Sequence, residues 1–178
     1  VGSNNNPLVT FTNGYVPNKV VLEGRTALQG KKTLTGRDMK AKEFKFELSA
    51  ITTGAPMPTS VANGVATAEN AGEGAESAFS FEAITFTKTG EYLYNITEKA
   101  MGKGGVTYDT TNYVAKVVVT DEGYDGQLDA VVTYYKDNGE AALEFNNSYK
   151  ADSVGLILGL TKRLNGRDLN KDEFTFAI

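Results

Sequence analysis

Three segments of the chain alternate hydrophobic and polar positions with the two-residue period of a β-strand: residues 27–35, 91–99 and 142–149. In each segment the alternation assigns one polar side chain to the inward face, and these are Lys32, Glu98 and Asn147. Their neighbours on that face include Leu28 and Leu34 for the first segment, Tyr94 and Ile96 for the second, and Leu143 and Phe145 for the third. An amine, a carboxylic acid and a carboxamide are therefore predicted to point into one core.

The same patterning predicts about seven strands, near residues 26–35, 42–51, 78–87, 91–99, 112–120, 127–136 and 141–149. Glycine, asparagine and aspartate mark turns at 88–90, 102–105, 121–126 and 137–139. The predicted fold class is an all-β, antiparallel β-sandwich. Residues 52–75 read as a polar loop, and two interpretations of it stay open, a short helix or a mobile segment.

The amino-acid composition excludes several kinds of functional site. Nine Tyr, nine Phe and only four Pro in 178 residues fit strands, and histidine, cysteine and tryptophan are absent. This excludes Ser-His-Asp triads, thiol nucleophiles, disulfides and the usual zinc sites, so we expect no metal and no cofactor. The net charge of −4 argues against nucleic-acid binding. The acidic run 121–129 lacks the spacing of an EF-hand loop and reads as a hairpin turn.

The chain contains an internal repeat. Residues 30–48 align without gaps on residues 160–178 with eight of nineteen positions identical, and Lys32 falls on Lys162. Residues 9–15 align on 143–149, and Asn13 falls on Asn147. We therefore predict the last strand of a preceding repeat in 1–15, a complete domain in 20–150, and the opening strands of a following repeat in 155–178. In the shared Gly-Arg-Asp motif, Arg37 is expected to brace the following turn.

A buried, unpartnered ionised group costs several kcal/mol, so three inward polar groups require a hydrogen-bonded network, a covalent product, or a misread strand face. The covalent hypothesis is an isopeptide bond, in which the Lys32 amine attacks the Asn147 carboxamide and ammonia leaves. Burial favours the neutral amine and the protonated acid that this reaction needs. We expect protonated Glu98 to polarise the Asn147 carbonyl and to relay protons.

Simpler interpretations stand beside this one. A strand lysine is usually a solvated surface residue, as expected for Lys31. Glu98 at a strand end would then pair with Lys99 or Lys103, and Asn147 would satisfy nearby backbone groups. The outward alternation of Asn146 makes it the weaker candidate for the acceptor amide.

Five motifs together carry a family resemblance: GKKTLTGRD at 30–38, KEFKFEL at 42–48, TGEYLYNITEK at 89–99, VTYDTTNYVAKVVVTD at 106–121, and LEFNNSY at 143–149. The chain resembles the streptococcal-type pilin isopeptide-linkage domains, which have the Cna B-type, reverse-immunoglobulin fold. The resemblance implies a stalk module of a Gram-positive pilus or cell-wall adhesin, at the extracellular cell surface, with neighbouring repeats as partners. By motif match Lys32 is the amine, Glu98 the acid and Asn147 the acceptor.

Some features of such proteins are not found. No sortase signal is recognised, and no apolar stretch approaches the length of a membrane span. The polar start at 1–6 does not resemble a signal peptide, so we expect a fragment or a mature piece. Because their repeats are incomplete, Asn13 and Lys162 are expected to remain unbonded.

Two rival function classes remain. The sandwich loops of an adhesin module can bind a host protein or glycan. A glycosidase needs two acids across a cleft, whereas only one inward acid is predicted, so we expect no enzyme beyond a single-turnover cross-link.

Overall fold

The computed structural model describes residues 8–177 and is nearly all β. The twelve strands of the described residues are β1 (Val20–Leu22), β2 (Gln29–Thr35), β3 (Lys45–Ala50), β4 (Val65–Glu69), β5 (Glu76–Ser80), β6 (Ile84–Phe86), β7 (Gly90–Lys99), β8 (Val106–Thr107), β9 (Asn112–Thr120), β10 (Asp129–Lys136), β11 (Gly139–Glu140) and β12 (Glu144–Tyr149). Two short 3₁₀ helices, η1 (Gly24–Thr26) and η2 (Glu122–Tyr124), complete the secondary structure. No described helix has the length and apolar character needed to cross a membrane.

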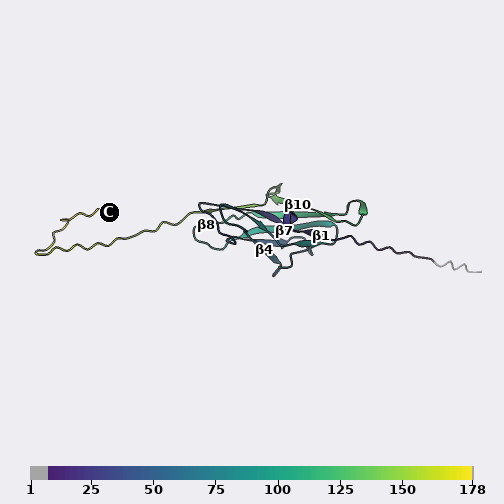
Figure 1. The fold of residues 1–178 in the computed structure, drawn as a ribbon, viewed down its shortest axis with the longest axis horizontal. Helices are drawn as coiled ribbons and strands as arrows, with labels where there is room; N and C mark the ends of the chain where they lie inside the picture. Colours follow the sequence, from purple (N-terminus) through teal and green to yellow (C-terminus); the bar gives the residue numbers. More distant parts are fainter. Residues whose placement is uncertain (1–7, 178) are drawn as a thin grey trace, which may run out of the picture.

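Two sheets form the sandwich (Figure 1). The larger has the order β11-β10-β9-β7-β3-β4, and the smaller has the order β5-β2-β12-β8. Strands β1 and β6 pair separately at one side. Neighbouring strands are antiparallel except β2 and β12, which lie side by side and run parallel. The first and last long strands of the domain are therefore direct neighbours, although most of the chain separates them.

Aromatic rings fill the space between the two large sheets. Phe46 of β3 stacks on Phe79 of β5 with ring centroids 3.7 Å apart, and Phe145 of β12 packs 5.3 Å from Phe46. Tyr113 of β9 meets Phe145 edge to face at 5.2 Å. Each such side chain stabilises the fold by about 1.5–3 kcal/mol through removal of apolar surface from water. These rings form part of the buried core of the sandwich.

The all-β sandwich is confirmed, but its strand count exceeds seven. The predicted strand 78–87 is two strands, β5 and β6, and the loop 52–75 contains β4 rather than a helix. In β4 the inward residues are Ala66 and Ala68, only 1% and 6% exposed, and alanine gives a weak strand signal. The two- and three-residue strands β1, β8 and β11 are too short for a periodicity to be recognised.

The predicted flanking strands do not appear in the described residues. Segments 8–17 and 151–177 contain no strand and leave the sandwich at opposite ends (Figure 1). Residues 1–7 and 178 of the predicted flanks lie outside the described residues. A strand needs a partner for its backbone groups, and neither segment has one in this structure. The division into repeats stays a prediction.

Candidate functional site

The three predicted polar side chains come together between the two large sheets. Lys32 on β2 and Asn147 on β12 project from adjacent parallel strands, whose register places Phe145 opposite Lys32. Glu98 reaches them from β7 in the facing sheet. Lys32 and the Glu98 side chain are fully buried, and Asn147 is 3% exposed. The alternation of each strand thus directs all three groups to the same place.

Glu98 is hydrogen-bonded to both Lys32 and Asn147. Lys32 Nζ donates to Glu98 Oε2 at 2.8 Å, and Asn147 Nδ2 donates to Glu98 Oε1 at 2.8 Å. The Lys32 ammonium also lies 4.8 Å from the centroid of the Phe44 ring, a cation–π contact. The nitrogen that would attack and the nitrogen that would leave are therefore held on the two oxygens of one carboxyl group.

The orientation of the Asn147 amide is set by the main chain. The backbone N–H of Asp109 donates to Asn147 Oδ1 at 2.7 Å, and only the carbonyl end of an amide can accept that bond. Glu98 consequently faces the amide nitrogen, and the prediction that it donates to the carbonyl oxygen is wrong for this structure. Strand alternation predicts the face of a side chain but not the rotation of its terminal amide.

Burial moves the protonation equilibria of the pair toward the neutral forms. Desolvation lowers the pKa of Lys32, although the contact with Glu98 partly opposes this. Desolvation raises the pKa of Glu98, against the opposing effect of Lys32 and Asn147. A proton shared between Lys32 and Glu98 thus costs less to move than it would in water, and a neutral amine becomes accessible.

The simpler interpretations of Lys32 and Glu98 do not describe this site, whereas Asn147 does accept a backbone N–H, that of Asp109. Lys99 pairs with Glu47 at 2.7 Å, and Lys103 approaches Glu43 at 3.9 Å, so neither neutralises Glu98. Lys31 is half exposed and pairs with Glu144 at 3.1 Å on the outer face. Lys32 and Glu98 instead form an ion pair with no exposure to solvent.

The sequence analysis does not identify Asp109 as part of this site. Its carboxylate accepts the backbone N–H groups of Thr111 and Asn146, both at 2.8 Å. The spacing Asp-x-Thr is a local signal for the first bond, because aspartate often accepts from the backbone two residues on. The second bond joins residues 37 positions apart and has no local signal.

The two repeat equivalents lie apart from this site. Asn13 and Lys162 are both exposed. Lys162 Nζ sits 4.6 Å over the ring of Phe174, as Lys32 sits over Phe44. Among the described residues no acid lies within ion-pair distance of Lys162. Neither residue therefore has the acid that the buried trio contains.

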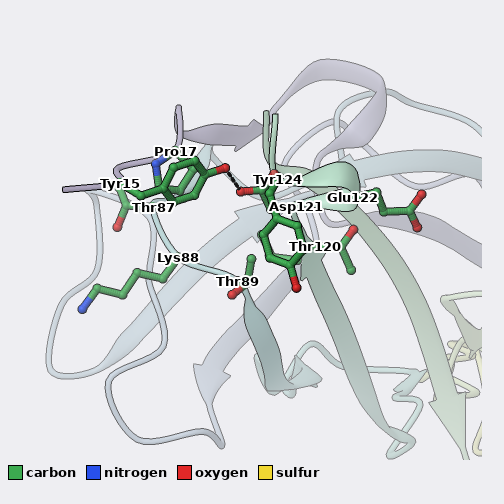
Figure 2. A pocket seen from close by; sticks show the side chains of 10 residues that line it. Tyr15, Pro17, Thr87, Lys88, Thr89, Thr120, Asp121, Glu122 and Tyr124 are labelled. Atoms are coloured by element: carbon green, nitrogen blue, oxygen red, sulfur yellow. Dashed lines mark hydrogen bonds between the residues drawn. The ribbon is translucent and has the colours of Figure 1, made fainter. Parts of the chain in front are cut away.

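A separate surface cavity of about 590 Å³ lies where the N-terminal segment meets the sandwich (Figure 2). The Tyr15 hydroxyl donates to the Asp121 carboxylate across it, and the Lys88 side chain points away from this hydrogen bond. The described residues contain no cluster of three or more side chains suited to a metal.

The fold and the site define a class of protein, an immunoglobulin-like sandwich with a lysine, an acid and an asparagine hydrogen-bonded in its core. Residues 28–150 match the family of Spy0128-like isopeptide containing domains, and the chain belongs to this family. The family resemblance predicted from the motifs is thus confirmed.

Several known proteins are similar to this chain. The chain is 34% identical over 102 residues to a pilin of Streptococcus pyogenes serotype M1, which covers 56% of this chain and 29% of that protein. It is similar to the major pilin T-13 of S. pyogenes serotype GAS131465, with 23% identity, a TM-score of 0.49 and coverage of 73% and 54% of the two chains. For another S. pyogenes major pilin the identity is 20%, the TM-score 0.43 and the coverage 78% and 51%. The chain spans under a third of the curated relative.

Proposed function

We propose that residues 20–150 form a structural stalk module of a Gram-positive pilus or cell-wall adhesin, stabilised by an autocatalytic isopeptide bond between Lys32 and Asn147. Family membership and the pilin relative support the stalk role and a location at the extracellular cell surface. One observation carries the proposed bond: Lys32 Nζ and Asn147 Nδ2 are held 2.8 Å from the two oxygens of the same buried carboxyl group.

The reaction begins with proton transfer from the Lys32 ammonium to the Glu98 carboxylate. The neutral amine attacks Asn147 Cγ, and negative charge moves to Oδ1. Glu98 then gives its proton to Nδ2 and takes one from the new C–N linkage, so that ammonia leaves and a secondary amide remains. Lys32 has lost two protons: one passes to ammonia by way of the carboxyl group, and the other stays on Glu98, which is protonated in the product. No external acid, base or oxidant is required.

Positioning accounts for the speed of such a reaction without a conventional active site. The strands hold both reacting groups in one buried site, and effective molarities for aligned intramolecular reactions reach about 10⁵ M or more. Because the product stays in place, each molecule reacts once. We therefore propose that the domain is not a turnover enzyme.

The bond would alter both stability and mechanics. Residues 32 and 147 are 115 positions apart, so by analogy with a disulfide the link removes about 4 to 5 kcal/mol of chain entropy from the unfolded state. It joins the parallel neighbours β2 and β12, the first and last long strands of the domain. Tension entering at one strand and leaving at the other would pass through a covalent bond rather than through hydrogen bonds.

We also propose that 1–15 and 155–178 belong to neighbouring repeats, which are the partners of this module. Local structure supports this for the C-terminal segment. Arg167 bonds to the carbonyl of Asp168 and to the carboxylate of Glu173, as Arg37 bonds to Asp38 and Glu43. The repeated sequence thus forms the same turn twice.

Intact mass of the denatured protein tests the bond. We expect a mass lower than the sequence mass by one ammonia, and the full mass in Glu98→Ala. Glu47→Ala is the matched control, since Glu47 pairs with Lys99 on the exposed face and has no contact with Lys32. An unmodified mass in the folded wild type would exclude the bond.

A second candidate function, recognition of a host protein or glycan, is favoured by the cavity in Figure 2. Its volume of about 590 Å³ suits a small ligand, and Tyr124 on its rim is 84% exposed. Glycan-dependent thermal stabilisation that Tyr124→Ala abolishes would support this function. A melting temperature that none of the tested glycans changes would oppose it.

A further inference from the structure

Asp109 lies in the connection between β8 and β9, directly beside β12. Strand β8 pairs with β12 only at Ser148 and Tyr149, so its ladder ends before the backbone of Asn146 is reached. The Asp109 carboxylate continues the contact where the ladder stops, because its Oδ2 accepts from the Asn146 N–H at 2.8 Å. At this point of the sheet edge, a side chain rather than a neighbouring strand accepts the hydrogen bond from the β12 backbone.

The same carboxylate also fixes its own backbone. Asp109 Oδ1 accepts from the Thr111 N–H at 2.8 Å, which closes a tight local turn. Its two oxygens therefore tie the connection to itself and to β12. This fixes the direction of the Asp109 N–H, which points at Asn147 Oδ1 from 2.7 Å.

That oxygen is where charge develops during the proposed reaction. Attack at Asn147 Cγ converts a carbonyl oxygen into an oxyanion, and a preorganised N–H at hydrogen-bond distance stabilises it. The Asp109 carboxylate cannot donate a hydrogen bond to this oxygen, because an ionised carboxylate only accepts, and it accepts from the N–H groups of Thr111 and Asn146. Burial raises the pKa of Asp109, but the N–H groups of Asn146 and Thr111 outweigh it and lower the pKa overall, consistent with a carboxylate that stays ionised and bound.

We propose that the main-chain N–H of Asp109 is the oxyanion donor of the cross-linking reaction and that the Asp109 carboxylate is the positioning group that aims it. This inference rests on the proposed function. It also explains why Asn147 rather than Asn146 is the acceptor: the N–H contacts the Asn147 side-chain oxygen, whereas Asn146 is exposed and offers its backbone to Asp109.

The experiment follows ammonia loss in time. Unreacted chain recovered from inclusion bodies in denaturant is refolded, quenched in acid at intervals and weighed intact, and the rate is taken after far-UV circular dichroism has recovered. Asp109→Ala should slow ammonia loss roughly tenfold to a hundredfold, somewhat less than removal of an oxyanion donor itself. Asp109→Asn, whose carboxamide oxygen can still accept one of the two N–H groups, should recover part of the rate.

Asp125→Ala is the matched control. Asp125 Oδ1 accepts the Gln127 N–H at 2.9 Å, the same local bond as in Asp109 to Thr111, but it lies outside the site. This variant should react at the wild-type rate. Wild-type rates in both folded Asp109 variants would overturn the inference and leave the proposed bond intact. Absence of ammonia loss from the wild type would instead remove the proposed function itself.

Discussion

Two turns of the molecule have the same sequence pattern and the same local structure but different surroundings. In residues 36–43, Arg37 donates to Glu43 from both terminal guanidinium nitrogens, Nη1 and Nη2, at 3.1 and 2.5 Å. In residues 166–173, Arg167 binds Glu173 with both nitrogens in the same way. The acid also accepts from the backbone of Lys40 in the first turn and Asn170 in the second.

The difference begins one residue after each acid. Phe44 is fully buried in the sandwich, whereas Phe174 is 42% exposed. Lys32 meets Glu98 in the core, whereas Lys162 remains in solvent. Local sequence is therefore sufficient to form the turn and to place an amine over an aromatic ring. Only the strands of the surrounding domain, above all β7 and β12, supply the acid and the amide with which that amine would react in the proposed cross-link.

The largest expected contrast is between the two lysines. Lys32→Met should abolish the ammonia loss and lower the free energy of unfolding by about 4 to 5 kcal/mol, since the cross-link no longer restrains the unfolded chain. Lys162→Met should change neither quantity. Intact mass and guanidinium unfolding measure the two effects. An equal loss of stability in both variants would show that burial does not distinguish the turns.

Replacing the aromatic residues beside the two lysines, Phe44 and Phe174, should change stability by almost as different amounts. Phe44→Ala removes a side chain with no exposed surface and should destabilise the domain by about 4 kcal/mol. Phe174→Ala removes a ring that no strand covers and should leave the unfolding midpoint unchanged. Thermal unfolding of the two variants provides the comparison. A midpoint shift for Phe174→Ala would mean that the C-terminal segment packs on the domain.

The turn glycines provide a third matched pair, because both have positive φ, +91° for Gly36 and +97° for Gly166. A Cβ at Gly36 would lie 2.0 Å from the carbonyl oxygen of Tyr149, whereas a Cβ at Gly166 meets no atom within 4 Å. Gly36→Ala should therefore cost about 3 kcal/mol from the clash and the backbone strain. Gly166→Ala should leave the denaturant midpoint of the domain where it is, and similar losses in both would contradict the comparison.

The smallest expected difference in stability comes from replacing the turn acids Glu43 and Glu173, and it depends on pH. The Arg37 guanidinium lowers the pKa of Glu43 to about 2, with help from the Lys40 N–H. A depressed folded-state pKa stabilises the fold above about pH 4, and this stabilisation is lost as the pH falls toward 2. Glu43→Gln should thus reduce stability at pH 7 by about 1 kcal/mol and have progressively less effect in acid.

Glu173→Gln is the control for that measurement. In the wild type, Glu173 forms the same hydrogen bonds in a solvent-exposed turn. Its replacement should therefore leave urea unfolding of the domain unchanged at every pH. A pH-independent difference between wild type and Glu43→Gln would mean that the Arg37 pair does not stabilise the fold through its charge.

The features of the fold and site that follow from local sequence patterns could be predicted from the sequence. Alternation directed Lys32, Glu98 and Asn147 to the core face, and the Gly-Arg-Asp motif predicted the Arg37 brace. It did not reveal β4, whose inward alanines give little strand signal, nor the turn of the Asn147 amide toward Asp109. Both depend on contacts between distant parts of the chain, which periodicity does not encode.

Peptide mapping of the denatured, protease-digested wild type tests the central claim most directly. The account predicts one branched peptide in which the Lys32 side chain is joined to the side chain of Asn147, while the peptides containing Lys162 and Asn13 are recovered with linear masses. Recovery of Lys32 and Asn147 in separate linear peptides, or of a branch at Lys162, would contradict it.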